Sequence, residues 1–173
     1  MSETILVTYA SRFGTTAGVA EAIGKTLSAA GAQVEVVAMK DVKDVAFYRA
    51  VVAGSAFNGG DWLPEAMQFM QKQQKELRAK PFAAFLTCMT LSMKKGDQHR
   101  THVSSWMEPV RRLVRPVSEG LFAGGLNIGS IPSFGDRLKF QLSVLFGVWK
   151  EGDHRDWNTI RTWANDLMPL LVR

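Results

Sequence analysis

Six residues near the amino end of the chain combine side chains and spacing that suit the binding of an anion. They are Ser11, Arg12, Phe13, Gly14, Thr15 and Thr16. Three hydroxyl groups can donate hydrogen bonds, and a glycine lets the backbone approach a ligand closely. If a helix follows, its first N–H groups and its dipole also favour a negative charge. This pattern predicts a phosphate-binding loop.

The composition of this loop narrows the kind of phosphate. It lacks the Gly-Lys-Ser/Thr ending of a Walker A loop and the three glycines of the dinucleotide fingerprint. Those loops bind triphosphates and pyrophosphates, whereas a hydroxyl-rich loop without lysine suits a single phosphate monoester, as in FMN. The other interpretation is an ordinary strand-to-helix turn with a Ser/Thr helix cap. The loop alone leaves both interpretations open.

Strands and helices alternate along the chain and must position this loop. Apolar, β-branched runs predict five strands, at residues 4–9, 33–39, 50–56, 82–88 and 120–128. Helices are expected from Thr15, Val42, Pro64, His102 and Asp156, and Pro109 predicts a kink or an early end in the fourth of them. This alternation predicts an α/β fold with a doubly wound parallel sheet. If the strand order is 2-1-3-4-5, the loops after the first, third and fourth strands meet at one edge of the sheet. Ligands bind at the carboxyl ends of such strands, where the strand order reverses.

Residues 129–155 form an insert that is too long for a simple connection between the last strand and the last helix. Within it, residues 136–150 predict a helix that is apolar on most sides, with a narrow non-apolar strip at Lys139, Ser143 and Gly147. The helix is too short to span a bilayer. We expect it to pack into the core; pairing with a second subunit or contact with a membrane surface are the alternatives.

The composition limits the classes of function. The 173 residues suit one domain. A single cysteine, Cys88, excludes an internal disulfide and any multi-cysteine metal site, and no metal site is expected. No signal peptide is evident, so a cytoplasmic location is expected. Residues 1–70 carry five basic and seven acidic side chains, so the net charge of +5 comes from the remainder. That half has no nucleic-acid-binding motif, and we expect Arg111, Arg112 and Arg115 to be solvated, with carboxylate-bearing ligands or anionic lipid as alternatives.

Several segments of the chain match a known family. Arg12, Gly14 and Thr16 fit an Arg-x-Gly-x-Thr loop, and residues 51–55 lead into Gly59. An apolar segment with Asp136-Arg137 follows Gly124-Gly125-Leu126, and Asp156-Trp157 opens the last helix. On these residues the chain resembles the flavodoxin family over essentially its whole length. Within that family it is most similar to the branch of menaquinone-dependent protoporphyrinogen dehydrogenases.

The resemblance implies a single flavodoxin-like domain over residues 1–173 that holds FMN without a covalent bond. It places the phosphate in the loop of residues 11–16. It places the flavin ring between two further loops, whose residues are Phe57, Asn58 and Gly59 on one side and Thr87, Cys88, Met89, Thr90 and Leu91 on the other. Phe57 or Trp62 could stack on the ring, with packing within the loop as the alternative for each.

The resemblance also implies an activity. We expect an FMN-dependent oxidoreductase that passes electrons from a porphyrinogen to a quinone, in the cytoplasm or at the inner face of the membrane. The alternative is a single-domain electron carrier that docks on redox proteins. Carrier flavodoxins are acidic and this chain is basic, which favours the oxidoreductase. A third hypothesis is a binding module that has lost FMN.

Overall fold

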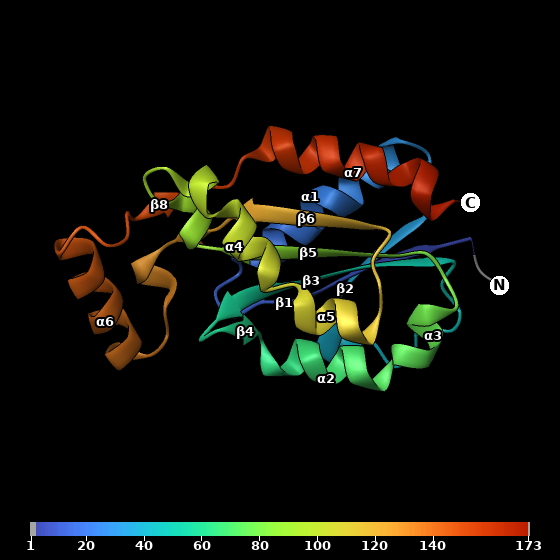
Figure 1. Ribbon diagram of the computed structural model, residues 1–173, viewed down its shortest axis with the longest axis horizontal. Helices are drawn as coiled ribbons and strands as arrows, with labels where there is room; N and C mark the ends of the chain where they lie inside the picture. The colour runs from blue at the N-terminus through green and yellow to red at the C-terminus, as the bar shows by residue number, and fades with distance from the viewer. Residues whose placement is uncertain (1–2, 173) are drawn as a thin grey trace.

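A parallel sheet of five strands forms the centre of the computed structural model, which describes residues 3–172 (Figure 1). The strands are β1 (Ile5–Ala10), β2 (Val34–Ala38), β3 (Ala50–Asn58), β5 (Phe82–Cys88) and β6 (Ser118–Ala123). Their order is β2-β1-β3-β5-β6, which is 2-1-3-4-5 when these five are counted alone. The predicted fold class is therefore confirmed.

Helices cover both faces of the sheet (Figure 1). On one face α1 (Thr15–Ala29) and α7 (Trp157–Leu171) pack against each other and against the sheet. The other face is covered by four shorter helices, α2 (Pro64–Lys72), α3 (Gln74–Arg78), α4 (Arg100–Ser105) and α5 (Glu108–Leu113). Each layer encloses its own apolar core, so β5, between them, is buried along its whole length. This burial agrees with its purely apolar sequence.

Two glycines in the sheet layer are required by packing. A Cβ atom added at Gly54 in β3 would lie 2.0 Å from the ring of Phe85 on β5. One added at Gly120 in β6 would lie 2.6 Å from the ring of Phe122. These phenylalanines pack together in the core beneath α1 and α7. The glycines therefore make room for the aromatic rings that fill this core.

Several predicted boundaries differ from the structure. The helix expected at residues 42–48 is absent; a short 3-10 helix, η1 (Met39–Asp41), precedes an irregular loop. The helix expected at residues 102–114 is divided into α4 and α5, and Pro109 lies in the first turn of α5. This position confirms that Pro109 limits a helix, because a proline without an N–H group is tolerated in a first turn.

The fifth strand also ends earlier than predicted. β6 stops at Ala123, and the chain leaves the sheet at Gly124, whose N–H donates to the carbonyl oxygen of Cys88 at 2.9 Å. The next residues form β7 (Gly125–Leu126), which pairs with β8 (Gly152–Asp153) at the far end of the insert. The insert is therefore a loop whose two ends are joined by a small antiparallel ladder.

The helix within the insert is α6 (Phe134–Leu145), preceded by η4 (Ile128–Ser130). Figure 1 shows α6 beyond the carboxyl ends of the strands, at the opposite end of the molecule from both termini. The expectation that it packs into the core is wrong, because none of its residues is buried. Its contacts are with a small separate cluster, in which Phe140, Val144 and Trp149 pack against Leu126, Ile128 and Ile131. Within residues 3–172, no helix has both the length and the apolar character needed to cross a membrane.

Candidate functional site

The loop between β1 and α1 has the backbone geometry of an anion cradle. Gly14 caps α1 with a φ of 85°, and its N–H donates to the hydroxyl of Ser11 at 3.1 Å. A Cβ atom added at Gly14 would meet nothing within 4 Å, so the positive φ rather than crowding favours glycine here. No side chain caps the start of α1. The first N–H groups of the helix are therefore available to a ligand.

A cavity of about 380 Å³ lies where the loops after β1, β3 and β5 meet. The structure thus brings together the three loops that the strand order predicted. Ten of the predicted site residues line this cavity: Ser11, Arg12, Phe13, Thr15, Thr16, Phe57, Asn58, Thr87, Cys88 and Met89.

The other four predicted residues lie elsewhere. Gly14 lines a neighbouring cavity of about 450 Å³ together with Phe13 and Thr15. Gly59 and Gly60, with φ of 66° and 105°, form a tight turn between β3 and β4 (Asp61–Trp62), and Gly59 does not line the cavity. Thr90 and Leu91 belong to a short 3-10 helix, η2 (Thr90–Ser92), that carries the chain past the cavity.

Two threonines join the phosphate loop to the neighbouring strand. The hydroxyls of Thr16 at the start of α1 and Thr87 at the end of β5 are 2.6 Å apart and buried. The hydroxyl of Thr15 donates to the carbonyl oxygen of Gly125 at 3.2 Å. These contacts within the chain hold the loop against β5 and against the insert without the help of a ligand.

The aromatic residues of the site are arranged differently from the prediction. Phe57 lines the cavity, and its ring stacks on Trp106 with 3.8 Å between centroids and 4° between planes. The edge of His102 contacts the same indole at 5.1 Å. Trp62, which was expected to be able to stack on the ligand, is 1 % exposed and belongs to the core below the sheet. It lies opposite Phe57 in the β3–β4 pair, and both side chains contact the core on this face of the sheet.

The insert supplies a wall of the cavity that the sequence interpretation missed. Four residues of α6 line it: Asp136, Lys139, Phe140 and Ser143. The ring of Phe140 contacts that of Phe13 edge to face at 6.3 Å. Lys139 and Ser143 form part of the narrow non-apolar strip visible in the sequence. That strip was the available signal, because a polar line on an otherwise apolar helix can mark the side that faces a polar ligand.

Arg155 at the end of the insert also supports the phosphate loop and was not foreseen. Its Nη1 donates to the carbonyl oxygen of Thr15 at 3.2 Å, while its Nε and Nη2 donate to the carboxylate of Asp153. Its guanidinium group lies 4.4 Å from the ring centroid of Trp157. The hydrogen bonds from Arg155 hold the pKa of Asp153 below its usual value. The pair therefore stays ionised at neutral pH and fixes the insert to the loop.

Cys88 is a buried thiol at the end of β5. It is 5 % exposed, and burial raises the pKa of its thiol above the usual value. A raised pKa disfavours the thiolate, which is the reactive form. Among the residues that the structure describes, no group of His, Cys, Asp and Glu side chains could hold a metal ion.

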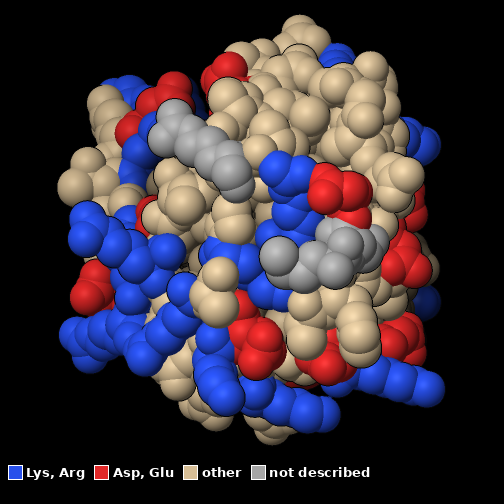
Figure 2. Space-filling view, turned by 90° about the vertical axis from the view of Figure 1, so that its right-hand side faces the viewer, with Lys and Arg blue, Asp and Glu red and all other residues tan. Residues whose placement is uncertain are grey.

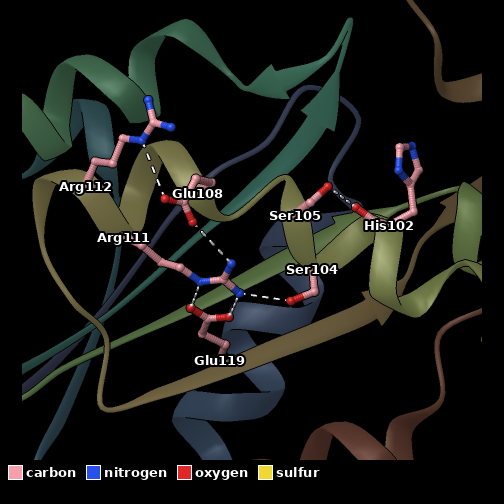
Figure 3. A network of polar contacts seen from close by, with 7 residues as sticks. All are labelled: His102, Ser104, Ser105, Glu108, Arg111, Arg112 and Glu119. Carbon is pink, nitrogen blue, oxygen red and sulfur yellow. Dashed lines mark hydrogen bonds and ion pairs between the residues drawn. The ribbon is translucent and has the colours of Figure 1, made fainter.

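Five basic residues of the second half line one hollow at the other end of the molecule, where the strands begin: Arg78, Lys80, Arg111, Arg112 and Arg115. Figure 2 shows this end, with Lys and Arg side chains over much of its left and lower part. Arg111 is only partly solvated, with 31 % of its side chain exposed: its Nε and Nη2 donate to both carboxylate oxygens of Glu119 at 2.7 and 2.6 Å, and Nη2 also donates to Ser104 (Figure 3). Arg112 has a side chain that is 78 % exposed and forms a loose ion pair with Glu108 at 3.5 Å.

Comparison with known families identifies the class of protein. The model of the flavodoxin domain matches residues 6–146, so the chain belongs to the flavodoxin family. The members of this family are FMN proteins, which confirms the cofactor predicted from the phosphate loop. A comparison with curated protein sequences finds no match, so no particular branch of the family is indicated.

Solved structures of flavodoxins share the fold. The flavodoxin of Streptococcus pneumoniae has a TM-score of 0.58 and 14% identity, with 96% of this chain and 98% of that one covered. Flavodoxin 2 of Bacillus cereus has a TM-score of 0.51 and 25% identity, with 83% and 97% covered. A Fusobacterium nucleatum flavodoxin mutant bound to FMN has a TM-score of 0.50 and 15% identity, with 69% and 68% covered.

Proposed function

We propose that this chain binds FMN in the 380 Å³ cavity and acts as a flavodoxin-type electron carrier that exchanges electrons with redox proteins. The observation that carries the proposal is the meeting of three loops at that cavity. One is a hydroxyl-rich phosphate loop at a helix start, and the other two end β3 and β5. Membership of the flavodoxin family supports the same conclusion.

The residues at the cavity fit the two ends of FMN. At the phosphate end, the hydroxyl of Ser11, the exposed guanidinium of Arg12 and the first N–H groups of α1 supply donors without a competing acid in the loop. At the ring end, Phe57 offers an aromatic side chain that Trp106 holds in place. The end of β5 offers backbone groups next to the small residues Thr87 and Cys88. A planar aromatic ring with polar edges suits these groups.

FMN supplies the electron-transfer chemistry when it is bound, and the chain supplies position and environment. The loop of residues 11–16 fixes the phosphate, and Phe57 orients the ring. Phe140 and Lys139 on α6 cover one side of the cavity and limit the access of water. The turn at Asn58, Gly59 and Gly60 is exposed and lies beside the cavity, so it is the surface at which a redox protein can approach.

The test is reconstitution followed by redox titration. Purified protein is incubated with FMN and with riboflavin, which lacks the phosphate, and each affinity is measured by the quenching of flavin fluorescence. We expect FMN to bind at least about 100-fold more tightly, because several charge-assisted hydrogen bonds are lost without the phosphate. A carrier is then expected to be reduced in two one-electron steps separated in potential. Equal affinities for the two flavins would contradict the proposed phosphate loop.

A second candidate function is an oxidoreductase that passes electrons from a small donor such as a porphyrinogen to a quinone. An outward apolar face on α6, next to the cavity, favours an acceptor that dissolves in lipid. The arginines proposed for carboxylate-bearing ligands do not favour a porphyrinogen at this site, because Arg111 pairs with Glu119 at the start of β6, at the opposite end of the sheet. Turnover of porphyrinogen with a menaquinone analogue distinguishes this candidate from a carrier, which shows none.

A further inference from the structure

The outer face of α6 is the largest group of exposed apolar side chains among the described residues. Its members are Phe134, Leu138, Leu142, Leu145 and Phe146, which are 77 %, 46 %, 45 %, 77 % and 77 % exposed. Because they are spaced by four, four, three and one positions, they lie in one sector of the helix. We name these five residues the α6 stripe. The opposite face of the helix, with Phe140 and Val144, packs against the small cluster of the insert.

We propose that the α6 stripe seats the protein on the surface of an anionic lipid membrane. The evidence for membrane binding is the stripe and the charges around it. The proposed function matters only because the proposed FMN cavity lies on the other side of α6. A helix with an apolar face and basic flanks lies in the plane of a membrane interface. Seated in this way, the protein holds the cavity close to the lipid, because the same helix forms one of the cavity walls.

The charges around the stripe have a small positive balance. Residues 133–151 contain three basic side chains, Arg137, Lys139 and Lys150, and two acids, Asp136 and Glu151. Lys139 is 81 % exposed and has only a loose contact with Asp136, at 3.8 Å. Beyond the end of the helix, Lys94 and Lys150 line one hollow together with Val148, which is itself 49 % exposed. Basic groups beside an apolar face complement the negative surface potential of anionic lipids.

The size of the stripe favours a membrane over a second copy of the chain. A standard protein interface uses roughly 20–30 residues on each side, with a polar rim of satisfied hydrogen bonds. The stripe offers five apolar side chains on one short helix. A helix of this length, about 18 Å, can insert its apolar face to a shallow depth without a partner of matching shape.

Co-sedimentation with vesicles tests the proposal. The FMN-loaded protein is mixed with vesicles of phosphatidylcholine alone or with added phosphatidylglycerol. We expect binding to the anionic vesicles and at least about tenfold weaker binding after the double substitution Leu142→Ser and Leu145→Ser, since two exposed leucines no longer enter the lipid. The matched control is Phe47→Ser, which removes an apolar side chain that is 72 % exposed outside α6. This control is expected to bind as the unsubstituted protein does.

Two further measurements keep the outcomes separate. A double substitution Lys94→Glu and Lys150→Glu is expected to weaken binding to the anionic vesicles and to leave binding to neutral vesicles unchanged. FMN affinity of all variants is measured in solution, so that a failure of the proposed function is seen independently of vesicle binding. Unchanged sedimentation of the Leu142→Ser and Leu145→Ser variant would overturn the proposal. A concentration-dependent dimer that this variant abolishes would overturn it in favour of self-association.

Discussion

The two ends of the parallel sheet differ in how completely their polar groups are satisfied by the chain itself. At the amino ends, Lys80 donates to the carbonyl oxygens of Val45, Ala46 and Tyr48, and Arg111 binds Glu119 through two hydrogen bonds. At the carboxyl ends, the start of α1 has no side-chain cap and Arg12 is exposed.

This difference shows where a ligand can add binding energy. Polar groups that already have internal partners contribute to stability, whereas groups left with spare hydrogen-bonding capacity can contribute to binding. Substitutions at the two ends are therefore expected to separate the two properties. Basic side chains cover much of the amino-end face, and two of them, Lys80 and Arg111, have internal partners (Figure 2).

The largest effect is expected for Gly14→Val in the phosphate loop. A β-branched residue is strained at a φ of 85°, and the loop must shift away from the phosphate position. We expect FMN affinity to fall by about 100-fold, measured by flavin fluorescence. Gly31→Val is the matched control, because Gly31 follows the other end of α1 with a φ of 96° and also has open space around it. It should lower thermal stability to a similar degree and leave FMN affinity unchanged.

At the amino ends of the strands, Lys80→Met tests whether polar groups with internal partners contribute to stability and not to FMN binding. The substitution removes a charged donor from three carbonyl oxygens of the loop before β3, of which that of Val45 still accepts from the N–H of Tyr48. We expect the free energy of unfolding to fall by about 2 kcal/mol in urea titrations, because hydrogen bonds from a charged donor are among the stronger ones. FMN affinity is expected to stay the same. A loss of affinity as large as that of Gly14→Val would remove the distinction between the two ends.

An intermediate effect is expected from the buried hydroxyl pair of Thr16 and Thr87, because substitutions there are expected to affect both stability and FMN binding. Each single change to valine leaves the partner hydroxyl unpaired, at a cost of about 1 kcal/mol in stability. In the double variant both hydroxyls are absent, so the two costs should not add. Only Thr16→Val is also expected to weaken FMN binding, by about tenfold. Additive losses of stability would show that the hydroxyls are not coupled.

The smallest effect concerns the ion pair of Asp153 and Arg155. The pKa of Asp153 is lowered by its hydrogen bonds with Arg155, so its contribution to stability is present above the ordinary carboxyl pKa of about 3.9 and is lost as the pH falls through the lower folded value. Asp153→Asn should therefore reduce stability at neutral pH by less than about 1 kcal/mol, because the pair is partly exposed. The two proteins should converge below pH 4 in acid unfolding curves. A constant difference at all pH values would contradict this origin.

The sequence was sufficient for the features that depend on local pattern. The apolar run at β5, the glycine in the phosphate loop and the cap at Asp156, whose carboxylate accepts from the N–H groups of Asn158 and Thr159, all have short-range signals. The alternation of strands and helices predicts a parallel sheet, and the order 2-1-3-4-5, which the family resemblance implies, placed three loops at one edge correctly.

Features that depend on long-range contacts were not predictable in the same way. Phe57 was correctly placed at the cavity, but its stacking on Trp106, which is 49 residues away in the sequence, requires α4 to be docked first. The role of Arg155 in holding Thr15 depends on the closure of the insert. The exposure of α6 was missed because an apolar pattern shows only that a helix avoids water in some state of the molecule, not that its own domain covers it.

The separate apolar cluster beneath α6 has a consequence for how the insert can change during evolution. Leu126, Ile128 and Ile131 anchor the insert without drawing on either of the two cores that hold the sheet together. Replacement of the segment between β7 and β8 can therefore alter which surface a flavin protein meets while the scaffold keeps its stability. The sequence of the insert can therefore vary independently of the sheet, and modest changes in it can create a new docking surface.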